Sequence, residues 1–492
     1  MTADLLPSRP RRLPLAKGLF AAATAVALLA SSAATSAQAV TYTSDTRPDL
    51  VPALSGYTDL WQPSGLNDLH GTVKDAATLQ WNDRLASWIN QHATANQKFR
   101  ALQNAAYLAS DGSGYDQSIT IADGLGKNLG AIYAQGRIDG SLPKTTALIN
   151  SSTGTTGAYV STGTAKATFS YPRPYLPGSA SATAVSGDDA ACAPDVVNGS
   201  SVTPIRKGKS WASADGTLKI TRVPDATDTT HAFATTDVVL SAGYGTKGIC
   251  TGGAFPSGHT TTAYQAGITL ATLLPELAPQ ILARASEAGN NRVVLGVHYP
   301  LDIIGGRMNG EIALASRWSD ASFRTDVLEP ARAELVSYLE SKCGNTLARC
   351  IASDTPYTDN PYGGARIPGG TDQIVTNRKS AVKVYTERLS YGFAPTSSTR
   401  QSASVPDGAE SLLLTTFPTL TNAQRRSVLA QTEIRSGNPL DTTSTSRHGT
   451  APGSWQRLNL AAAMSATVLV SRDGRVRVLG TGGPAKVIAP KK

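Results

Sequence analysis

The chain has 492 residues, a formal net charge of +9 and only 16% charged residues. This length can bury a large core and predicts more than one domain, and the composition excludes a disordered chain. Residues 1–39 hold four basic residues against one aspartate, so the remainder carries about +6. The basic residues are dispersed and form no tail of the kind that binds nucleic acid.

The N-terminus has the pattern of a signal peptide. A basic stretch at 9–17 precedes an apolar run at 18–30, and Ala-Gln-Ala at 37–39 fits a cleavage site before Val40. A membrane anchor is the alternative, but the apolar run is short for a bilayer. No later segment has eighteen uninterrupted apolar residues. We therefore expect a secreted protein with no membrane span in the mature chain.

The next segments predict a mainly α fold. Between 72 and 150, Trp81, Leu85, Trp88 and Ile89 recur at helical spacing, and helical patterns return at 257–287 and 301–342. Residues 178–250 change to Ser, Thr, Gly and Asp and contain a strand-like piece at 218–221. We interpret 40–350 as a helical domain with an insertion at about 178–250.

A second change of composition follows residue 350. Residues 353–376 are rich in Pro, Gly, Asp and Thr, as in a linker or long loop. Residues 422–431 predict a helix with Thr421 as its N-cap, and 466–479 predict two strands joined through Asp473 and Gly474. Residues 351–492 are thus a mixed α/β C-terminal region of unknown role, either an accessory module or an integral part of the core.

Four cysteines in an exported chain predict disulfides. Three pairings are open; we favour Cys192–Cys250, which joins the ends of the insertion, and the local pair Cys343–Cys350. A zinc site is the alternative, but no Cys-x2-Cys spacing or neighbouring histidine supports it.

Two segments carry groups suited to an anion. Lys166 and Arg173 lie seven residues apart, and Pro174 stiffens the chain after them. In the second segment Ser257 is a natural N-cap, and Gly258 lets the backbone approach a ligand. His259 follows in the first helical turn, where free N–H groups attract an anion. Taken alone, the first segment is better explained by solvated charge, and the second by an ordinary helix cap with a surface histidine.

A third segment combines a cation with a His–Asp pair. Arg292 precedes His298, and Pro300 favours a helix start that places Asp302 in the first turn. Asp302 is then positioned to hydrogen-bond one ring nitrogen of His298 and to fix the tautomer of the ring. A local cap is the simpler alternative for this pair.

Taken in order, these segments resemble the signature of the type 2 phosphatidic acid phosphatase superfamily, which includes bacterial acid phosphatases and vanadium haloperoxidases. The motifs are Lys-x6-Arg-Pro from Lys166, Pro-Ser-Gly-His at 256–259 and Arg-x5-His-x3-Asp from Arg292. The resemblance covers about residues 150–310 and implies a helical-bundle core. Asn291 stands where the family usually has Ser, and the spacer before Pro256 is longer than usual, so the insertion is expected to form a lid or to narrow the substrate range.

The resemblance also implies roles. His298 would be the nucleophile, Asp302 would stabilise its ring, and His259 would be the acid and base. No metal or other cofactor is expected, because three side-chain cations neutralise the phosphoryl charge. The phosphate-binding residues would be Lys166, Arg173, Ser257, Gly258 and Arg292.

We therefore expect a phosphoric monoester hydrolase of the acid phosphatase type, acting on a small phosphorylated substrate. A haloperoxidase that holds vanadate in the same pocket is the main alternative. A lipid phosphatase and a non-catalytic phosphate-binding protein are weaker alternatives. The sequence leaves the oligomeric state open. Four further histidines have no partner motif and are interpreted as structural: His70, His92, His231 and His448.

Overall fold

The computed structural model describes residues 40–106, 114–174, 192, 199–442 and 453–489. The predicted signal peptide, His448 and part of the insertion lie outside these residues. Helices dominate the described part and confirm the mainly α prediction. Their bounds are α1 (Ala76–His92), α2 (Ala95–Ala105), α3 (Gln117–Thr120), α4 (Lys127–Ile138), α5 (Pro143–Ile149), α6 (Gly163–Phe169), α7 (Lys247–Cys250), α8 (Gly258–Leu273), α9 (Ala278–Val294), α10 (Pro300–Ser319), α11 (Ala321–Phe323), α12 (Glu329–Cys343), α13 (Leu347–Ser353), α14 (Arg378–Arg388), α15 (Asn422–Thr432) and α16 (Leu460–Ala463).

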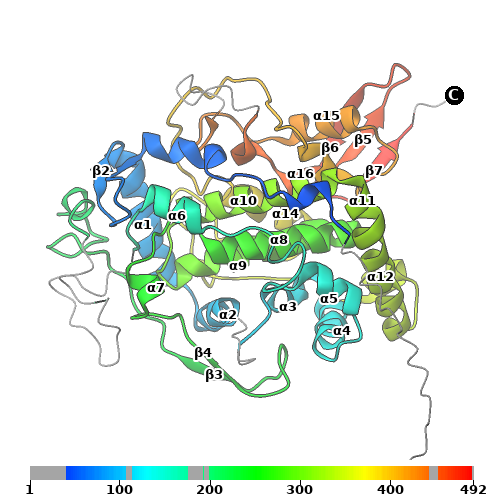
Figure 1. The fold of residues 1–492 in the computed structure, drawn as a ribbon, viewed down its shortest axis with the longest axis horizontal. Coiled ribbons are helices and arrows are strands. Elements are labelled where there is room, and N and C mark those ends of the chain that lie inside the picture. The colour runs from blue at the N-terminus through cyan, green and yellow to red at the C-terminus, as the bar shows by residue number, and fades with distance from the viewer. Residues whose placement is uncertain (1–39, 107–113, 175–191, 193–198, 443–452, 490–492) are drawn as a thin grey trace, which may run out of the picture. The chain divides into compact units, whose positions relative to one another are not determined.

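The centre of the fold consists of α8, α9 and α10, with α8 packed on both others (Figure 1). Nearly every residue of these three helices is buried, as expected for helices that are covered on all sides. Two glycines let α10 approach the start of α8. A Cβ at Gly305 would lie 2.7 Å from the Phe255 ring, and one at Gly306 would lie 2.7 Å from the Ser257 carbonyl oxygen. This close approach brings the second and third motifs together.

The strands form small peripheral sheets. An antiparallel pair joins β1 (Trp61–Pro63) to β2 (Gly71–Val73), and a second joins β3 (Ala226–Asp228) to β4 (Val238–Leu240) within the insertion. In the C-terminal region β5 (Thr467–Val470) lies between antiparallel β6 (Val476–Gly480) and parallel β7 (Lys486–Ile488). The C-terminal prediction of mixed α/β structure is confirmed. The strand expected at 218–221 is wrong, because that segment forms only an isolated bridge from Leu218 to Ala212.

The C-terminal region packs directly on the central helices. Tyr385 and Leu412 belong to the same buried apolar cluster as Leu270 of α8. Arg307 of α10 is fully buried beside Glu311 and donates to the carbonyl groups of three residues, Trp455, Gln456 and Leu458. Contacts group Tyr42–Lys492 into one compact unit. Of the two roles left open for the C-terminal region, this packing favours an integral part of the core.

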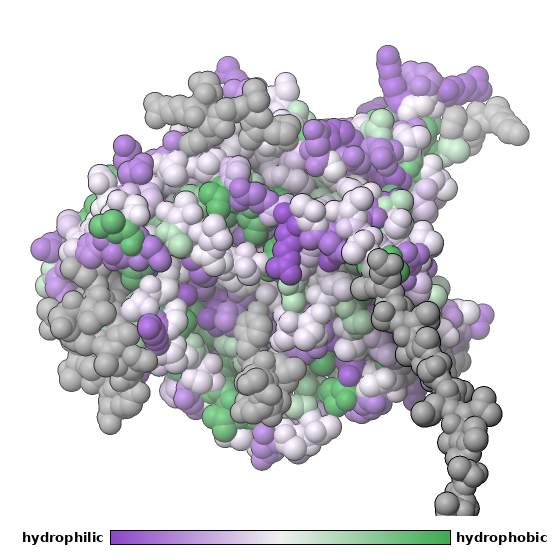
Figure 2. Space-filling view, viewed as in Figure 1, coloured by the Kyte–Doolittle hydropathy of each residue, from purple (hydrophilic) through white to green (hydrophobic). Residues whose placement is uncertain are grey.

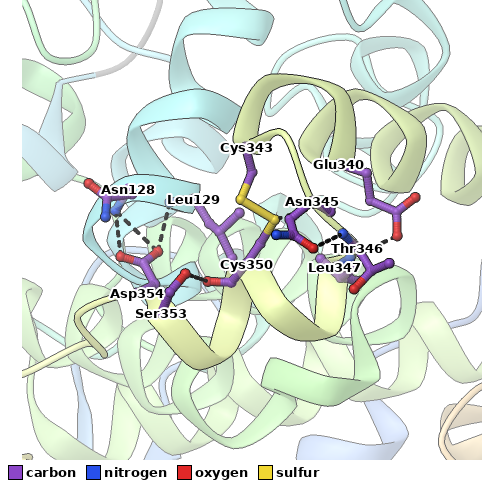
Figure 3. Close-up of a disulfide and its surroundings, with 10 residues drawn as sticks. All are labelled: Asn128, Leu129, Glu340, Cys343, Asn345, Thr346, Leu347, Cys350, Ser353 and Asp354. Carbon is purple, nitrogen blue, oxygen red and sulfur yellow. Dashed lines mark hydrogen bonds between the residues drawn. A yellow bond between two sulfur atoms is a disulfide. The ribbon is translucent and has the colours of Figure 1, made fainter.

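Both favoured disulfides are present. Cys192 pairs with Cys250, and Cys343 pairs with Cys350. The second bridge links the end of α12 to α13 (Figure 3). Directly after α13, the carboxylate of Asp354 accepts hydrogen bonds from the first N–H groups of α4. The bridge therefore supports a carboxylate at the positive end of that helix.

Hydrophilic and near-neutral residues cover most of the face shown in Figure 2, and hydrophobic residues form separate patches on it. Across the described residues, no single helix has both the length and the hydropathy needed to cross a membrane. The helices α8 and α9 meet that test only when taken together, and they are bent by 115° at their junction.

Candidate active site

The second motif begins α8 as predicted. Ser257 is the N-cap, and its Oγ accepts the Thr260 N–H at 3.3 Å and the Thr260 hydroxyl at 2.8 Å. The Ser257 N–H donates to the Asp302 carbonyl at 3.0 Å, so it is not free for a ligand, contrary to our expectation. The first N–H that α8 can offer to an anion is that of Gly258, which has no acceptor within the helix. A Cβ at Gly258 would meet only the Thr162 hydroxyl.

The third motif runs from the last turn of α9 into α10. Tyr299 is the N-cap of α10, and Pro300 is its first residue. Asp302 in the first turn accepts the Tyr299 N–H at 2.9 Å through Oδ2, and the same oxygen lies 3.0 Å from His298 Nδ1. The predicted His–Asp pair is therefore formed, and it is fully buried.

Arg173 determines which nitrogen of His298 carries the proton. Its Nη1 lies 3.0 Å from His298 Nε2 and also donates to the Val297 carbonyl at 2.8 Å. A guanidinium group has only donors, so Nε2 must be the acceptor. The neutral ring therefore carries its proton on Nδ1 and donates it to Asp302. His298 presents an unprotonated Nε2, as a nucleophile requires.

Carbonyl groups just before α8 hold the two cations of the first motif. Arg173 Nε donates to the Gly252 carbonyl at 3.1 Å. Lys166 Nζ donates to the Gly253 carbonyl at 2.7 Å and to the Ala254 carbonyl at 3.2 Å. These contacts orient both side chains without offsetting their charge. Burial, followed by the charge of Arg173, lowers the pKa of Lys166 well below 10.5, and a bound anion would favour its charged form.

The acceptor of His259 comes from α2. His259 Nε2 lies 3.2 Å from the carbonyl oxygen of Ala105, the last residue of that helix. A carbonyl oxygen accepts only, so Nε2 of this ring carries a proton. The end of α2 is held in turn by the Asn104 side chain, which accepts hydrogen bonds from Asn291 and Arg284. Asn291, which stands where the family usually has Ser, thus donates a hydrogen bond to Asn104 of α2.

The charges of the site shift its titrating groups. Burial, followed by the charge of Arg292, lowers the pKa of His259 well below 6.5. Burial, followed by the charge of Arg173, lowers the pKa of His298 in the same direction. Burial raises the pKa of Asp302 to about 7, opposed by the Tyr299 N–H and the nearby cations. Both histidines are therefore neutral at pH 7 when no anion offsets the cations.

These groups surround one cavity of about 340 Å³. Ser257 and Asp302 do not line the cavity. Ser257 caps α8, and Asp302 orients His298, so both position residues that do line it. Ala105 and six residues of the insertion line the same cavity: Ser241, Ala242, Gly243, Thr246, Gly248 and Ile249. Six of the eight predicted site residues line the cavity: Lys166, Arg173, Gly258, His259, Arg292 and His298.

A buried ion pair that the sequence analysis missed supports the loop of the third motif. Arg206 of the insertion binds both carboxylate oxygens of Asp83 at 2.9 Å and donates to the Tyr299 hydroxyl at 2.9 Å. Asp83 shares a helical face with Leu79 and Ala86, both fully buried. A carboxylate within such an apolar stripe is a signal that could have indicated a buried partner.

Comparison with known proteins supports the motif assignment. The model of the PAP2 superfamily matches residues 147–325, which include all three motifs. This segment belongs to the PAP2 superfamily. The matched segment contains α8, α9 and α10 and every residue that lines the cavity except Ala105.

Curated relatives of the chain carry acid phosphatase names. An acid phosphatase of Zymomonas mobilis is 36% identical over 103 residues, which is 21% of this chain and 39% of that protein. A non-specific acid phosphatase of Providencia stuartii is 33% identical over 72 residues, or 15% and 29% of the two chains. One of Salmonella typhi is 32% identical over 83 residues, or 17% and 33%. The chain thus spans less than half the length of these relatives.

Proposed function

We propose that this protein is a secreted, metal-independent acid phosphatase that hydrolyses phosphomonoesters through a phosphohistidine intermediate. One observation carries the proposal: the unprotonated Nε2 of His298 belongs to a cavity that also holds Lys166, Arg173 and Arg292. The acid phosphatase names of the PAP2 relatives support the same reaction class.

In the first step His298 Nε2 attacks phosphorus, and the bond from phosphorus to the leaving oxygen breaks. The three cations and the Gly258 N–H bind the other phosphoryl oxygens and stabilise the charge that develops on them. His259 gives a proton to the leaving oxygen, so the product leaves as an alcohol. Asp302 stabilises the positive ring of the phosphohistidine.

In the second step a water molecule replaces the alcohol. His259, now neutral, takes a proton from the water as its oxygen bonds to phosphorus. The bond from phosphorus to His298 Nε2 breaks, and inorganic phosphate leaves. The ring then recovers the neutral form whose Nδ1–H faces Asp302. The cations perform the charge neutralisation that a metal supplies in other phosphatases, so chelators should leave the rate unchanged.

The test is to trap the intermediate. Enzyme mixed with a ³²P-labelled phosphomonoester and quenched should carry label that is stable to alkali and lost in acid. His298→Ala should abolish both label and turnover. His92→Ala is the matched control, because His92 stacks on Trp88 and lies outside the cavity. Full turnover by His298→Ala would refute the mechanism, and inhibition by a chelator would refute metal independence.

Vanadate distinguishes the haloperoxidase alternative. For a phosphatase, vanadate should compete with substrate and inhibit. Halide oxidation on addition of vanadate and peroxide, without phosphatase activity, would favour the alternative. Secretion is tested separately: mature protein recovered from the culture medium should begin at Val40, and the two disulfides are consistent with an oxidising compartment.

A further inference from the structure

We propose that the six insertion residues that line the cavity, all within 241–249, are the specificity element of the site, and that they select phosphomonoesters with a compact, uncharged leaving group. This inference rests on the proposed phosphatase function. The PAP2 motifs account for the side of the cavity that binds phosphate. Apart from Ala105, the rest of the lining is what we call the wall: Ser241, Ala242, Gly243, Thr246, Gly248 and Ile249.

The position of this wall makes it the surface that a leaving group meets. Lys166, Arg173, Arg292 and His298 line the same cavity, and in the proposed mechanism they bind or attack the phosphoryl group. When His298 attacks phosphorus, the leaving oxygen is directly opposite Nε2, so the organic group points away from His298. Apart from Ala105, all of the lining that the motif residues do not supply comes from the insertion, so the organic group is expected to contact these insertion residues.

The chemistry of the wall indicates which groups it accepts. The six lining residues are small or aliphatic and carry no charge. Lys247 lies among them in the sequence, but it is exposed and does not line the cavity. Thr246 Oγ1 donates to the Gly243 carbonyl at 2.8 Å, and Ser241 Oγ accepts the Gly243 N–H at 3.1 Å. A second anionic group on the substrate would thus find no cation on this wall. A cavity of about 340 Å³ is also at the small end of ligand sites, roughly 300–1,000 Å³.

The segment that carries the wall is hydrogen-bonded to the chain just before His298. Tyr244 donates its hydroxyl to the carbonyl of Leu295, three residues before His298. At the other end, Cys250 closes the wall through its disulfide with Cys192. The wall therefore keeps its place relative to the nucleophile, and the size of the cavity is a property of the fold.

Gly248 offers a direct test of the wall. A Cβ at Gly248 would meet no atom within 4 Å, so a larger side chain can be added there without a clash. We expect Gly248→Leu to lower kcat/KM for 1-naphthyl phosphate about 10-fold or more relative to that for methyl phosphate. Gly163→Leu is the matched control, because Gly163 has equally open space, begins α6 and lies outside the cavity. In this control the ratio should not change.

A second variant tests the charge preference. Thr246→Arg places a cation on the wall, and it should raise kcat/KM for 4-carboxyphenyl phosphate relative to phenyl phosphate. Inhibition by vanadate should be the same in both wall variants, which shows that the phosphate side is intact. Unchanged ratios in both Gly248→Leu and Thr246→Arg, with vanadate still bound, would overturn the inference. Hydrolysis of none of these esters by the wild type would instead overturn the proposed function.

Discussion

Substitution of Asp302 separates two contributions of this carboxylate, orientation of His298 and stabilisation of its positive ring. Oδ2 takes part in both hydrogen bonds, with the Tyr299 N–H and with His298 Nδ1. Oδ1 meets no donor within the described part of the chain. In Asp302→Asn the amide oxygen can take the place of Oδ2 and keep both bonds, so the main loss is the charge.

The size of that loss follows from the hydrogen bond to His298. A hydrogen bond to a charged group contributes about 1.5–3 kcal/mol, and one between neutral groups about 0.5–1.5 kcal/mol. The difference of about 1–2 kcal/mol corresponds to a fall of about 5- to 30-fold in rate. Asp302→Ala loses orientation as well, and a lost positioned group costs about 100- to 1,000-fold.

The assay is kcat/KM for one phosphomonoester, with circular dichroism to confirm that each variant is folded. Asp237→Asn is the matched control, because Asp237 does not line the cavity. Its carboxylate forms an exposed pair with His231, with 2.8 Å between Oδ1 and Nε2. The kcat/KM of this variant should equal that of the wild type. If Asp302→Asn lost as much activity as Asp302→Ala, the amide oxygen would not be orienting the ring, and our account of Oδ2 would be refuted.

Three further predictions concern stability and pH. Arg206→Leu leaves the buried charge of Asp83 unpaired and should lower the free energy of unfolding, measured in urea, by about 3–5 kcal/mol. The double variant Arg206→Leu with Asp83→Leu should lose less, because no buried charge is left without a partner. Removing the Cys192–Cys250 disulfide, whose cysteines are 58 residues apart, should lower the free energy of unfolding by roughly 4 kcal/mol. Removing the Cys343–Cys350 disulfide of Figure 3, whose cysteines are seven residues apart, should lower it by roughly 2 kcal/mol in the same unfolding experiment. Because the pKa of His259 is lowered, its proton is lost at lower pH than from an ordinary imidazole, and kcat/KM should already be falling with rising pH below 6.5.

Each of these predictions has a clear contrary result. Equal losses for the single and double Leu variants would show that the unpaired charge is not the cause. A greater cost for the short bridge than for the long one would contradict the loop-length argument. A rate that rises with pH through 6.5 would show that a protonated His259 is not required.

Local signals in the sequence predicted the local geometry of the motif segments. The N-cap Ser257, Pro300 at the start of its helix and the four-residue spacing of His298 and Asp302 all specify geometry within one or two turns. Such geometry depends on the backbone preferences of neighbouring residues, so it can be predicted from the sequence without knowledge of the fold. The order of the three motifs then indicated that their segments come together, and residues of all three line one cavity.

Contacts between distant segments could not be predicted in this way. His259 finds its acceptor at Ala105, 154 residues away, and Arg206 finds Asp83 across 123 residues. The strand expected at 218–221 failed for a related reason: Ile220 packs against Gly296 instead of pairing with a strand. These outcomes depend on which surfaces the insertion covers, and tertiary packing overrides local propensity there.

The carbonyl groups that hold Lys166 and Arg173 have a consequence for the stability of the whole fold. Carbonyl oxygens orient these cations but leave them to repel each other and Arg292 across one cavity. An oxyanion bound among them removes that repulsion only in the folded protein, so its binding adds to the free energy of unfolding. At 100 times its dissociation constant this gain is about 2.7 kcal/mol. Product phosphate should therefore both protect the enzyme against heat and slow its turnover, since the same contacts that stabilise the fold delay release.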